Sequence, residues 1–337
     1  MRQHLLALAL IAALGGCQQA DSPAPATGTE AATPAGDAAV DAAFADLSKR
    51  ALDTWMQLSP ISATQIGDHR YDSEIDDLSA AGQQKVLTAY KALLADLDKI
   101  DVSKLSRENQ VDAAILRNQL QSEVWTAEVL QSPKWDPQMY NGMAGSALYG
   151  LMAREFAPLP ERLKSATARM EKLPQIFAQA RENLDPARVP KIHAETVAKQ
   201  NRGILSIVDT FITPHIGELP AEDQKRLQAA IEGLKKAVDE QQTWLDKTLV
   251  PNAKGDFRIG AELYDQKLKF ALNSSLSRAE IGERARAELK RVRQDMYGIA
   301  QTVLKDKPGA PALPANPSDE QQQAAIEAAL ELAYADK

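Results

Sequence analysis

The sequence predicts an all-α protein, with antiparallel helices packed around one elongated core and long irregular loops between some of the helices. Apolar residues recur at spacings of three and four along most of the chain, which places them on one face of a helix. Several of these stretches begin with residues that favour a helix N-terminus. Strand signals are weak, because no long alternating run of β-branched residues occurs.

The first helices are expected from residue 39 onward. One apolar face is formed by Phe44, Leu47, Ala51, Trp55 and Leu58. A second has the same spacing and is formed by Val86, Tyr90, Leu93, Leu94 and Leu97. A third helix is expected to begin after Ser106, because a serine oxygen at this position can accept from a free backbone N–H of the first turn.

Two longer helices are expected in the middle of the chain. One follows Pro160, which suits a first helical turn, and its apolar residues are Leu163, Met170, Leu173, Ile176 and Phe177. Pro174 lies within this helix and predicts a kink or a break there. The other covers residues 221–248, where Leu227, Ile231, Leu234, Val238 and Leu245 share a face.

Capping boxes predict the last two helices. Ser277 and Glu280 have the spacing at which the serine and the glutamate satisfy each other's backbone N–H, and the helix that follows should reach about Val303. Ser318 and Gln321 repeat the pattern before a further apolar face. Five basic residues on the first of these helices are expected to form its solvated side, paired with Glu283, Glu288 and Asp295; they are Arg284, Arg286, Lys290, Arg291 and Arg293.

Three stretches lack helical periodicity: residues 59–80, 131–159 and 249–262. The second contains Asn141-Gly142, which is expected to lie in a glycine-rich loop. Long loops within a regular fold often carry binding residues. We therefore expect any site of this chain to draw on these stretches.

The N-terminus predicts export and lipidation. Arg2 precedes an apolar run from Leu5 to Leu14, which is too short to span a bilayer as a helix and fits a secretory signal. The closing Leu14-Gly15-Gly16-Cys17 resembles the bacterial lipobox, which implies acylation of Cys17 and a lipid bilayer as its partner. The alternative is an ordinary signal peptide with an incidental cysteine. Residues 1–16 are thus the signal, 17–38 a disordered Ala/Pro/Thr-rich tether, and 39–337 the helical domain.

Composition excludes several classes of function. The formal net charge is −7 and no long basic run occurs, which argues against nucleic acid as a partner. The single cysteine cannot form an intramolecular disulfide. Gln18 follows Cys17, and by resemblance to the sorting rules of double-membraned bacteria this implies the outer membrane, facing the periplasm.

No complete catalytic motif occurs in the sequence. There is no H-E-x-x-H zinc motif, no G-x-S-x-G elbow and no phosphate-binding glycine loop. Asp72, Asp76 and Asp77 lack the spacing of a calcium loop and are expected to be solvated. His193 is expected to be a surface or packing residue. We predict no catalytic residue and no metal ligand in this chain.

Two segments resemble the bacterial domain-of-unknown-function 885 family. They are Ser59-Pro-Ile-Ser-Ala-Thr-Gln-Ile-Gly-Asp-His-Arg-Tyr-Asp72 and Ile259-Gly-Ala-Glu-Leu-Tyr-Asp-Gln-Lys-Leu268, the latter followed by Ser277 to Ala285. The resemblance covers about 42 to 337. It implies a helical protein similar to zinc-dependent metallopeptidases, whose HExxxGH-type motif and glutamate motif lie beyond the equivalent of residue 337.

The resemblance implies that this chain is the N-terminal part of a longer hydrolase of peptides, with zinc expected only where a C-terminal continuation exists. The alternative is a non-catalytic helical lipoprotein that acts as a binding or scaffold module. Four residues are candidates for a substrate pocket: His69, Arg70, Arg258 and Tyr264. For His69 the alternative is hydrogen bonding within its loop. For Tyr264, whose hydroxyl could donate to a peptide carbonyl, it is packing in the core.

Overall fold

The structure, a computed structural model, describes residues 36–335 of the chain. Within this range the chain is helical and forms no β-strand, apart from an isolated bridge between Pro190 and Gly255, which confirms the all-α prediction. None of these helices is long and apolar enough to cross a membrane. The signal peptide, Cys17 and nearly all of the expected tether lie outside the described residues.

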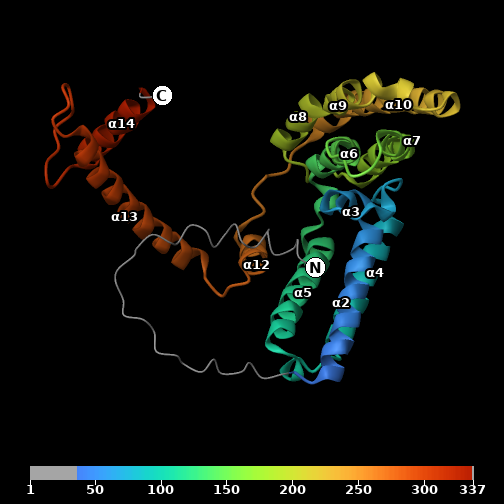
Figure 1. Cartoon of the computed structure of the whole chain (residues 1–337), viewed down its shortest axis with the longest axis horizontal. Coiled ribbons are helices and arrows are strands. Elements are labelled where there is room, and N and C mark those ends of the chain that lie inside the picture. The colour runs from blue at the N-terminus through green and yellow to red at the C-terminus, as the bar shows by residue number, and fades with distance from the viewer. Residues whose placement is uncertain (1–35, 336–337) are drawn as a thin grey trace.

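The first region, here called the N-terminal bundle, consists of α2 (Ala38–Leu58), α4 (Ala80–Leu97) and α5 (Arg107–Trp125), which lie side by side (Figure 1). Their apolar faces meet in one buried cluster that includes Phe44, Tyr90 and Leu120. Ser106 caps α5 by accepting from the Asn109 N–H at 3.4 Å, as expected.

Residues 36–38 belong to this bundle, which corrects the expected end of the tether at residue 38. The Asp37 N–H donates to the Lys104 carbonyl at 2.8 Å, and the Asp37 carboxylate accepts from the Ala39 N–H to cap α2. Gly36 packs so closely that an added Cβ would lie 2.2 Å from the Ser106 nitrogen. The body therefore begins by residue 36.

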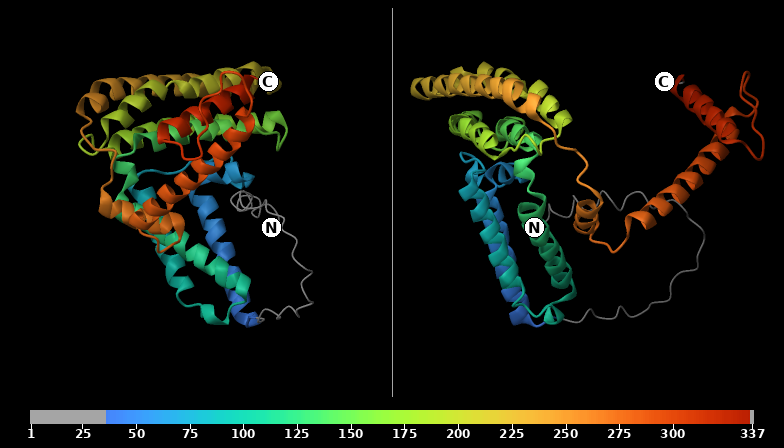
Figure 2. Two further views of the ribbon diagram at one scale, coloured as in Figure 1. Left: turned by 90° about the vertical axis from the view of Figure 1, so that its left-hand side faces the viewer. Right: turned by 180° about the vertical axis from the view of Figure 1, so that it is seen from behind.

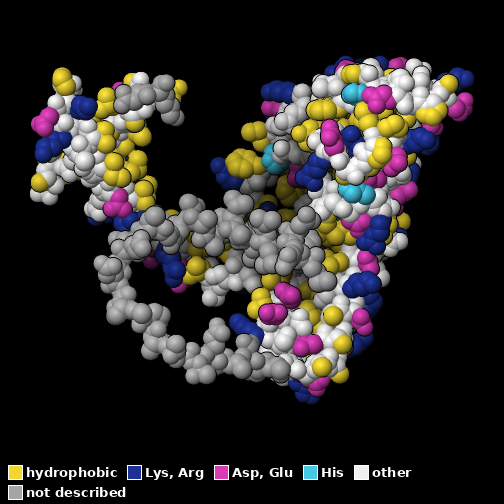
Figure 3. All heavy atoms as spheres, viewed as in Figure 1, with side chains coloured by type: hydrophobic (Ala, Val, Ile, Leu, Met, Phe, Trp, Pro, Cys, Tyr) yellow, Lys and Arg dark blue, Asp and Glu magenta, His cyan; other side chains and the backbone are white. Residues whose placement is uncertain are grey.

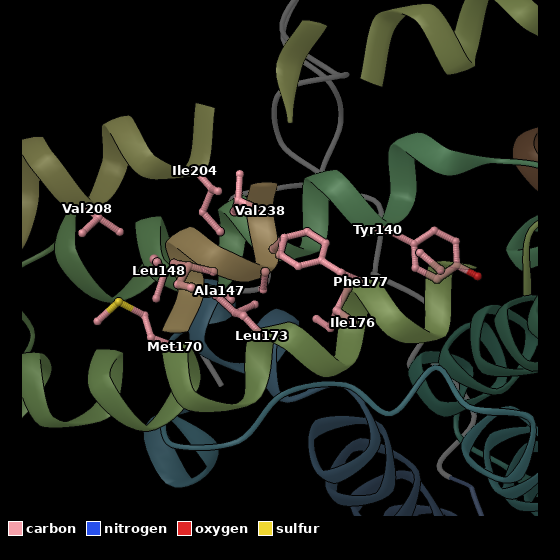
Figure 4. Packing of buried hydrophobic residues seen from close by; sticks show 14 of the residues in the cluster. Tyr140, Ala147, Leu148, Met170, Leu173, Ile176, Phe177, Ile204, Val208 and Val238 are labelled. Carbon is pink, nitrogen blue, oxygen red and sulfur yellow. The ribbon is translucent and has the colours of Figure 1, made fainter. Parts of the chain in front are cut away.

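The second region, the central body, lies across one end of the bundle (Figure 1). Its three long helices are α6 (Pro137–Met152), α7 (Leu159–Asn183) and α10 (Ala221–Trp244), and its shorter ones are α3 (Pro60–Ile66), α8 (Lys191–Gln200), α9 (Gly203–Phe211) and α11 (Val250–Asn252). Figure 4 shows Leu148, Met170, Leu173 and Phe177 pointing toward one another between the helices. Each such buried side chain contributes about 1.5–3 kcal/mol to folding.

The short helical turns occupy the connections. They are η2 (His69–Tyr71), η3 (Val102–Lys104), η4 (Thr126–Leu130), η5 (Ser132–Lys134), η6 (Thr213–Glu218) and η7 (Leu245–Leu249), of which η4 and η7 are π-helical. The turn η7 continues α10, so the expected helix over 221–248 is confirmed in extent.

One expectation about this region was wrong. Asn141-Gly142 lies in α6 and not in a loop, because Asp136 caps the helix, Pro137 suits its first turn, and Tyr140, Ala144 and Leu148 are buried one turn apart. This burial outweighs the low helix propensity of the glycines. At Pro174, where a kink or a break was expected, α7 continues without a break, and the neighbouring Leu173 and Ile176 are buried.

The third region, the C-terminal arm, consists of α13 (Arg278–Leu304) and α14 (Asp319–Ala335) and projects away from the other two (Figures 1 and 2). Both expected capping boxes are confirmed, at Ser277 with Glu280 and at Ser318 with Gln321. α12 (Ala261–Leu272) precedes the arm and contacts α5. The indole Nε1–H of Trp125 in α5 donates to the side-chain oxygen of Gln266 in α12 at 2.6 Å.

The buried apolar residues form three clusters, one in each region, where the sequence predicted one elongated core. The cluster of the central body is the largest, and that of the arm comprises only Tyr297, Ala300, Leu304 and Ala325. Helical periodicity identifies each buried face but carries no information about which helix covers it. The sequence therefore could not show that the faces divide into separate cores.

Candidate functional site

A polar pocket lies between the turn η2 and the start of α7. Its volume is about 340 Å³, and its wall includes residues 69–74, the loop residues Phe156 and Ala157, and Glu161, Arg162 and Ser165 of α7. The turn follows Gly67, whose φ of 95° ends α3 in a left-handed conformation that a glycine adopts without strain. Asp68 then caps η2 by accepting from the Arg70 N–H at 3.1 Å. These local features place His69 and Arg70 at the pocket.

Arg169 of α7 lies fully buried behind this pocket. Its Nε donates to the Glu74 carbonyl at 2.9 Å, and its Nη1 donates to the Ala147 carbonyl at 2.9 Å. Its Nη2 donates to the Pro60 carbonyl at 3.0 Å and to the Thr64 hydroxyl at 2.6 Å. One guanidinium thus connects α3, the pocket loop, α6 and α7.

Burial and neighbouring carboxylates act on this guanidinium in opposite directions. Burial lowers the pKa of Arg169 to about 10, while the carboxylates of Asp72, Asp76 and Glu74 act in the opposite direction. Arg169 is therefore a cation at neutral pH. A buried charge is tolerated when its donors find acceptors, and each of the three guanidinium nitrogens donates to at least one backbone carbonyl here.

Asp72 links the buried arginine to His69. Its Oδ1 accepts from the Thr64 hydroxyl at 2.6 Å, and its Oδ2 lies 2.9 Å from the His69 Nδ1. Since a carboxylate accepts, Nδ1 carries the proton and Nε2 of a neutral His69 is an acceptor. The imidazole also stacks on Phe156, with ring centroids 3.6 Å apart and planes 11° apart. The ring is therefore fixed in orientation and in tautomer.

The expectation that Asp72, Asp76 and Asp77 are all solvated was wrong. Asp72 is 7% exposed and Asp76 is 6% exposed, and only Asp77 faces solvent. Asp76 accepts from the Ile61 N–H at 3.1 Å, and burial raises its pKa to about 6. The two buried carboxylates face Arg169. The sequence of the loop alone could not predict this, because Arg169 lies on a helix more than 90 residues further along the chain.

The four candidate pocket residues are not brought together. His69 and Arg70 line the pocket, and His69 forms the expected hydrogen bond within its loop, while its role in substrate binding stays a prediction. Arg70 pairs with Asp53 at 2.9 Å and with Asp68 at 2.6 Å, and these hydrogen bonds raise its pKa.

Arg258 and Tyr264 lie away from this pocket. The Arg258 guanidinium stacks on the Phe257 ring at 4.3 Å, and Tyr264 in the first turns of α12 is 48% exposed, so it is not packed in the core. Gly260 precedes α12 with a φ of 84°. An added Cβ at Gly260 would meet no atom within 4 Å, so its conformation rather than a close approach requires glycine.

The described residues offer no group of three or more His, Cys, Asp or Glu side chains that could hold a metal ion. His193 lies 6.3 Å from Trp135, measured between ring centroids, and His215 pairs with Glu218 on the surface. Neither approaches the pocket that His69 lines. Residues 36–335 therefore do not fit a zinc centre.

The sequence carried one signal for the buried network that its apolar pattern did not reveal. Arg162 and Arg169 are seven residues apart, and with Ala166 and Leu173 they share the inward face of α7. Arg162 is 7% exposed and donates to the Ala157 carbonyl at 3.0 Å. Cations on the buried face of an amphipathic helix indicate buried polar contacts.

Fold and pocket together define a class: an all-helical protein whose polar pocket is supported by a buried arginine. The particular family follows from comparison of the sequence with family models. Residues 60–336 match the model described as "Bacterial protein of unknown function (DUF885)", and the chain belongs to this family. The resemblance inferred from the two segments is confirmed at the level of the family. A comparison with curated proteins gives no match.

A solved structure supports the same assignment. It is described as "a putative lipoprotein of unknown function from Shewanella oneidensis", and its TM-score with this chain is 0.73 at 29% sequence identity. The alignment covers 85% of this chain and 51% of the other. This chain therefore spans about half the length of that lipoprotein.

Proposed function

We propose that this chain is the N-terminal helical part of an exported, lipid-anchored hydrolase that resembles zinc-dependent peptidases. The observation that carries the proposal is the match of 85% of this chain to 51% of the Shewanella oneidensis lipoprotein. A protein of that length has room for a second part of similar size. Because residues 36–335 do not fit a zinc centre, the catalytic residues would belong to that second part.

The proposed localisation is at a membrane, outside the cytoplasm. The name of the Shewanella relative supports a membrane-anchored, exported protein. For this chain we propose acylation of Cys17, with the body held at the outer membrane on its periplasmic side. The lipid supplies the attachment, since each buried methylene contributes about 0.8 kcal/mol.

The role we propose for the pocket is to hold part of a peptide substrate. The Nε2 of a neutral His69 can accept a hydrogen bond from a peptide N–H, because Asp72 fixes the proton on Nδ1. Glu74 and Glu161 line the same pocket and would attract an amino group. No step of bond cleavage is assigned to these residues.

The test is the reading frame downstream of Lys337 at its locus. We expect it to continue into a segment with an HExxxGH-type motif. The continuous protein should then bind zinc stoichiometrically and hydrolyse peptides, and replacement of the motif's glutamate by glutamine should abolish hydrolysis. A stop codon at position 338, with no such motif in any downstream frame, would sink the proposal.

A second candidate function is a binding module without catalysis. It is favoured by the pocket of His69, whose lining residues all lie within the described part of the chain. If this is the function, the full chain should unfold in a cooperative transition and bind a small peptide. His69→Ala should weaken that binding, whereas His215→Ala, which changes an exposed histidine on η6, should not.

A further inference from the structure

The C-terminal arm projects away from the rest of the described chain (Figure 2). A second cavity, larger than the pocket of His69, lies in this arm. It is a groove of about 820 Å³ between α13 and the segment that leads into α14. The Tyr297 hydroxyl donates to the Pro314 carbonyl at 2.7 Å and holds this segment against α13. The groove thus has two walls joined by a hydrogen bond and by the buried cluster of the arm.

Three cations line one side of this groove. Arg286, Lys290 and Arg293 are spaced by four and by three residues, which places them on one face of α13. None of the three forms an ion pair with a carboxylate in the part of the chain that the structure describes. The sequence predicted that the basic run would be paired along the helix.

Within the described residues, that prediction is confirmed for Arg291. Arg291 donates to Glu288 at 2.6 Å and to Asp295 at 2.5 Å, and it does not line the groove. On the other wall, Asp319 is the acidic residue that faces the three cations. The groove therefore carries an excess of positive charge on a chain whose net charge is −7.

The rest of the groove combines polar and apolar surface. Gln294 and Asn316 supply amide donors, and Leu289 and Pro317 supply apolar surface. Gly298 lies in the floor, where an added Cβ would meet no atom within 4 Å. A compact anion could approach the helix closely at this glycine.

We propose that this groove binds a phosphate group through Arg286, Lys290 and Arg293. A phosphate has three or more acceptor oxygens and up to two negative charges, which match several convergent cations better than a single carboxylate does. The phosphate is either free or the headgroup of a phospholipid, whose apolar part would lie against Leu289 and Pro317. The proposal does not depend on the hydrolase proposed above.

The experiment is titration calorimetry of the full purified chain at low salt with two probes, inorganic phosphate and dihexanoyl phosphatidic acid below its micelle concentration. Saturable binding with one site is expected for phosphate in at least one of these forms. Equal binding of both probes assigns free phosphate, and binding of only the lipid assigns the headgroup. Absence of saturable binding for both probes would overturn the proposal.

Three variants test the site itself. Each cation removed should weaken binding roughly fivefold, so Arg286→Gln, Lys290→Gln and Arg293→Gln together should weaken it about a hundredfold. Gly298→Leu should abolish binding by filling the floor, and its fold should persist because the position is open. The matched control for each single variant is Arg291→Gln, which also removes one positive charge from the same helix but outside the groove.

The outcomes separate a site from general attraction. Loss in the triple variant and in Gly298→Leu, with Arg291→Gln within about twofold of the wild type, supports the groove. An equal loss in Arg291→Gln would show that only the overall charge of α13 matters and would overturn the proposal. Succinate binding as tightly as phosphate would also overturn it, because the groove would then select carboxylates.

Discussion

The central body and the C-terminal arm have the same helical sequence pattern and differ in how completely it is buried. In the central body, Leu163, Leu173 and Ile176 are 0% exposed and the charged Arg169 is enclosed. In the arm, Leu289 is 61% exposed and Ile299 is 64% exposed. Figure 3 shows hydrophobic side chains along the side of the arm that faces the rest of the molecule. A periodic apolar face is therefore necessary for a core but not sufficient.

The difference in burial arises from the number of helices that pack against each apolar face. α7 packs against α6 on one side and α10 on the other, whereas α13 packs against α14 and the segment between them. Because most helical stability in proteins comes from packing of an amphipathic face, the arm should be the less stable region. Four pairs of substitutions, ordered by expected effect, test the buried network of the central body and its contrast with the arm.

The largest effect is expected from Arg169→Met in the central body. Methionine keeps much of the volume but leaves the Thr64 hydroxyl and the carbonyls of Pro60 and Ala147 without their buried donor, so the free energy of unfolding should fall by about 3–5 kcal/mol. Urea denaturation measures it. The control is Arg226→Met on α10, whose exposed pair with Glu171 should contribute at most about 1 kcal/mol. Similar losses in the two variants would show that the burial of Arg169 adds nothing to the stability of the central body.

The second effect is pH-dependent and concerns Asp76. Its folded pKa of about 6 lies above the ordinary value of 3.8, so the folded state holds this proton more tightly than the unfolded state does. Stability should therefore fall as the pH rises from about 4 to about 6. Asp76→Asn, which keeps an acceptor for the Ile61 N–H, should remove this fall and exceed the wild type by about 1–3 kcal/mol at pH 8.

The measurement is urea denaturation at a series of pH values. Asp77→Asn is the control, since Asp77 faces solvent one residue away, and it should retain the fall between pH 4 and pH 6. If the stability of the wild type does not fall relative to that of Asp76→Asn through this window, Arg169 holds Asp76 ionised despite its burial.

The helix caps and the network of Arg169 show where prediction of structure from the sequence succeeds and where it fails. The class of fold, the apolar faces and the caps at Ser106, Ser277 and Ser318 depend on local chemistry, and all could be predicted. The network of Arg169 depends on groups 22 to 109 residues away in the sequence. Nothing local to the loop of Asp72 indicates that a distant helix buries it.

The third effect is the loss of a tyrosine hydroxyl that forms the same kind of hydrogen bond in both regions. In the central body, the Tyr140 hydroxyl donates to the Pro133 carbonyl at 2.7 Å, and in the arm the Tyr297 hydroxyl donates to Pro314 at the same distance. Tyr140→Phe should lower the global free energy of unfolding by about 1 kcal/mol. Tyr297→Phe should leave the global value unchanged and should increase amide hydrogen exchange in α13 and α14 alone.

Exchange that increases throughout the molecule in Tyr297→Phe would mean that the arm unfolds together with the central body. In that case the two regions would form one cooperative unit, and the difference in burial would have no counterpart in local stability. Unchanged exchange in the arm would mean that the bond to Pro314 contributes nothing to holding its segment.

The smallest effect is expected from removal of one methyl group at two matched isoleucines. Ile176 is 0% exposed in the central body, so Ile176→Val should cost about 0.5–1.5 kcal/mol through lost burial and a small cavity. Ile299 is 64% exposed in the arm, so Ile299→Val should change the free energy of unfolding by less than about 0.5 kcal/mol. Urea denaturation of both variants measures the two losses in the free energy of unfolding. Should Ile299→Val cost as much as Ile176→Val, the side chain is covered in solution, and the apolar face of α13 then has a partner that residues 36–335 do not supply.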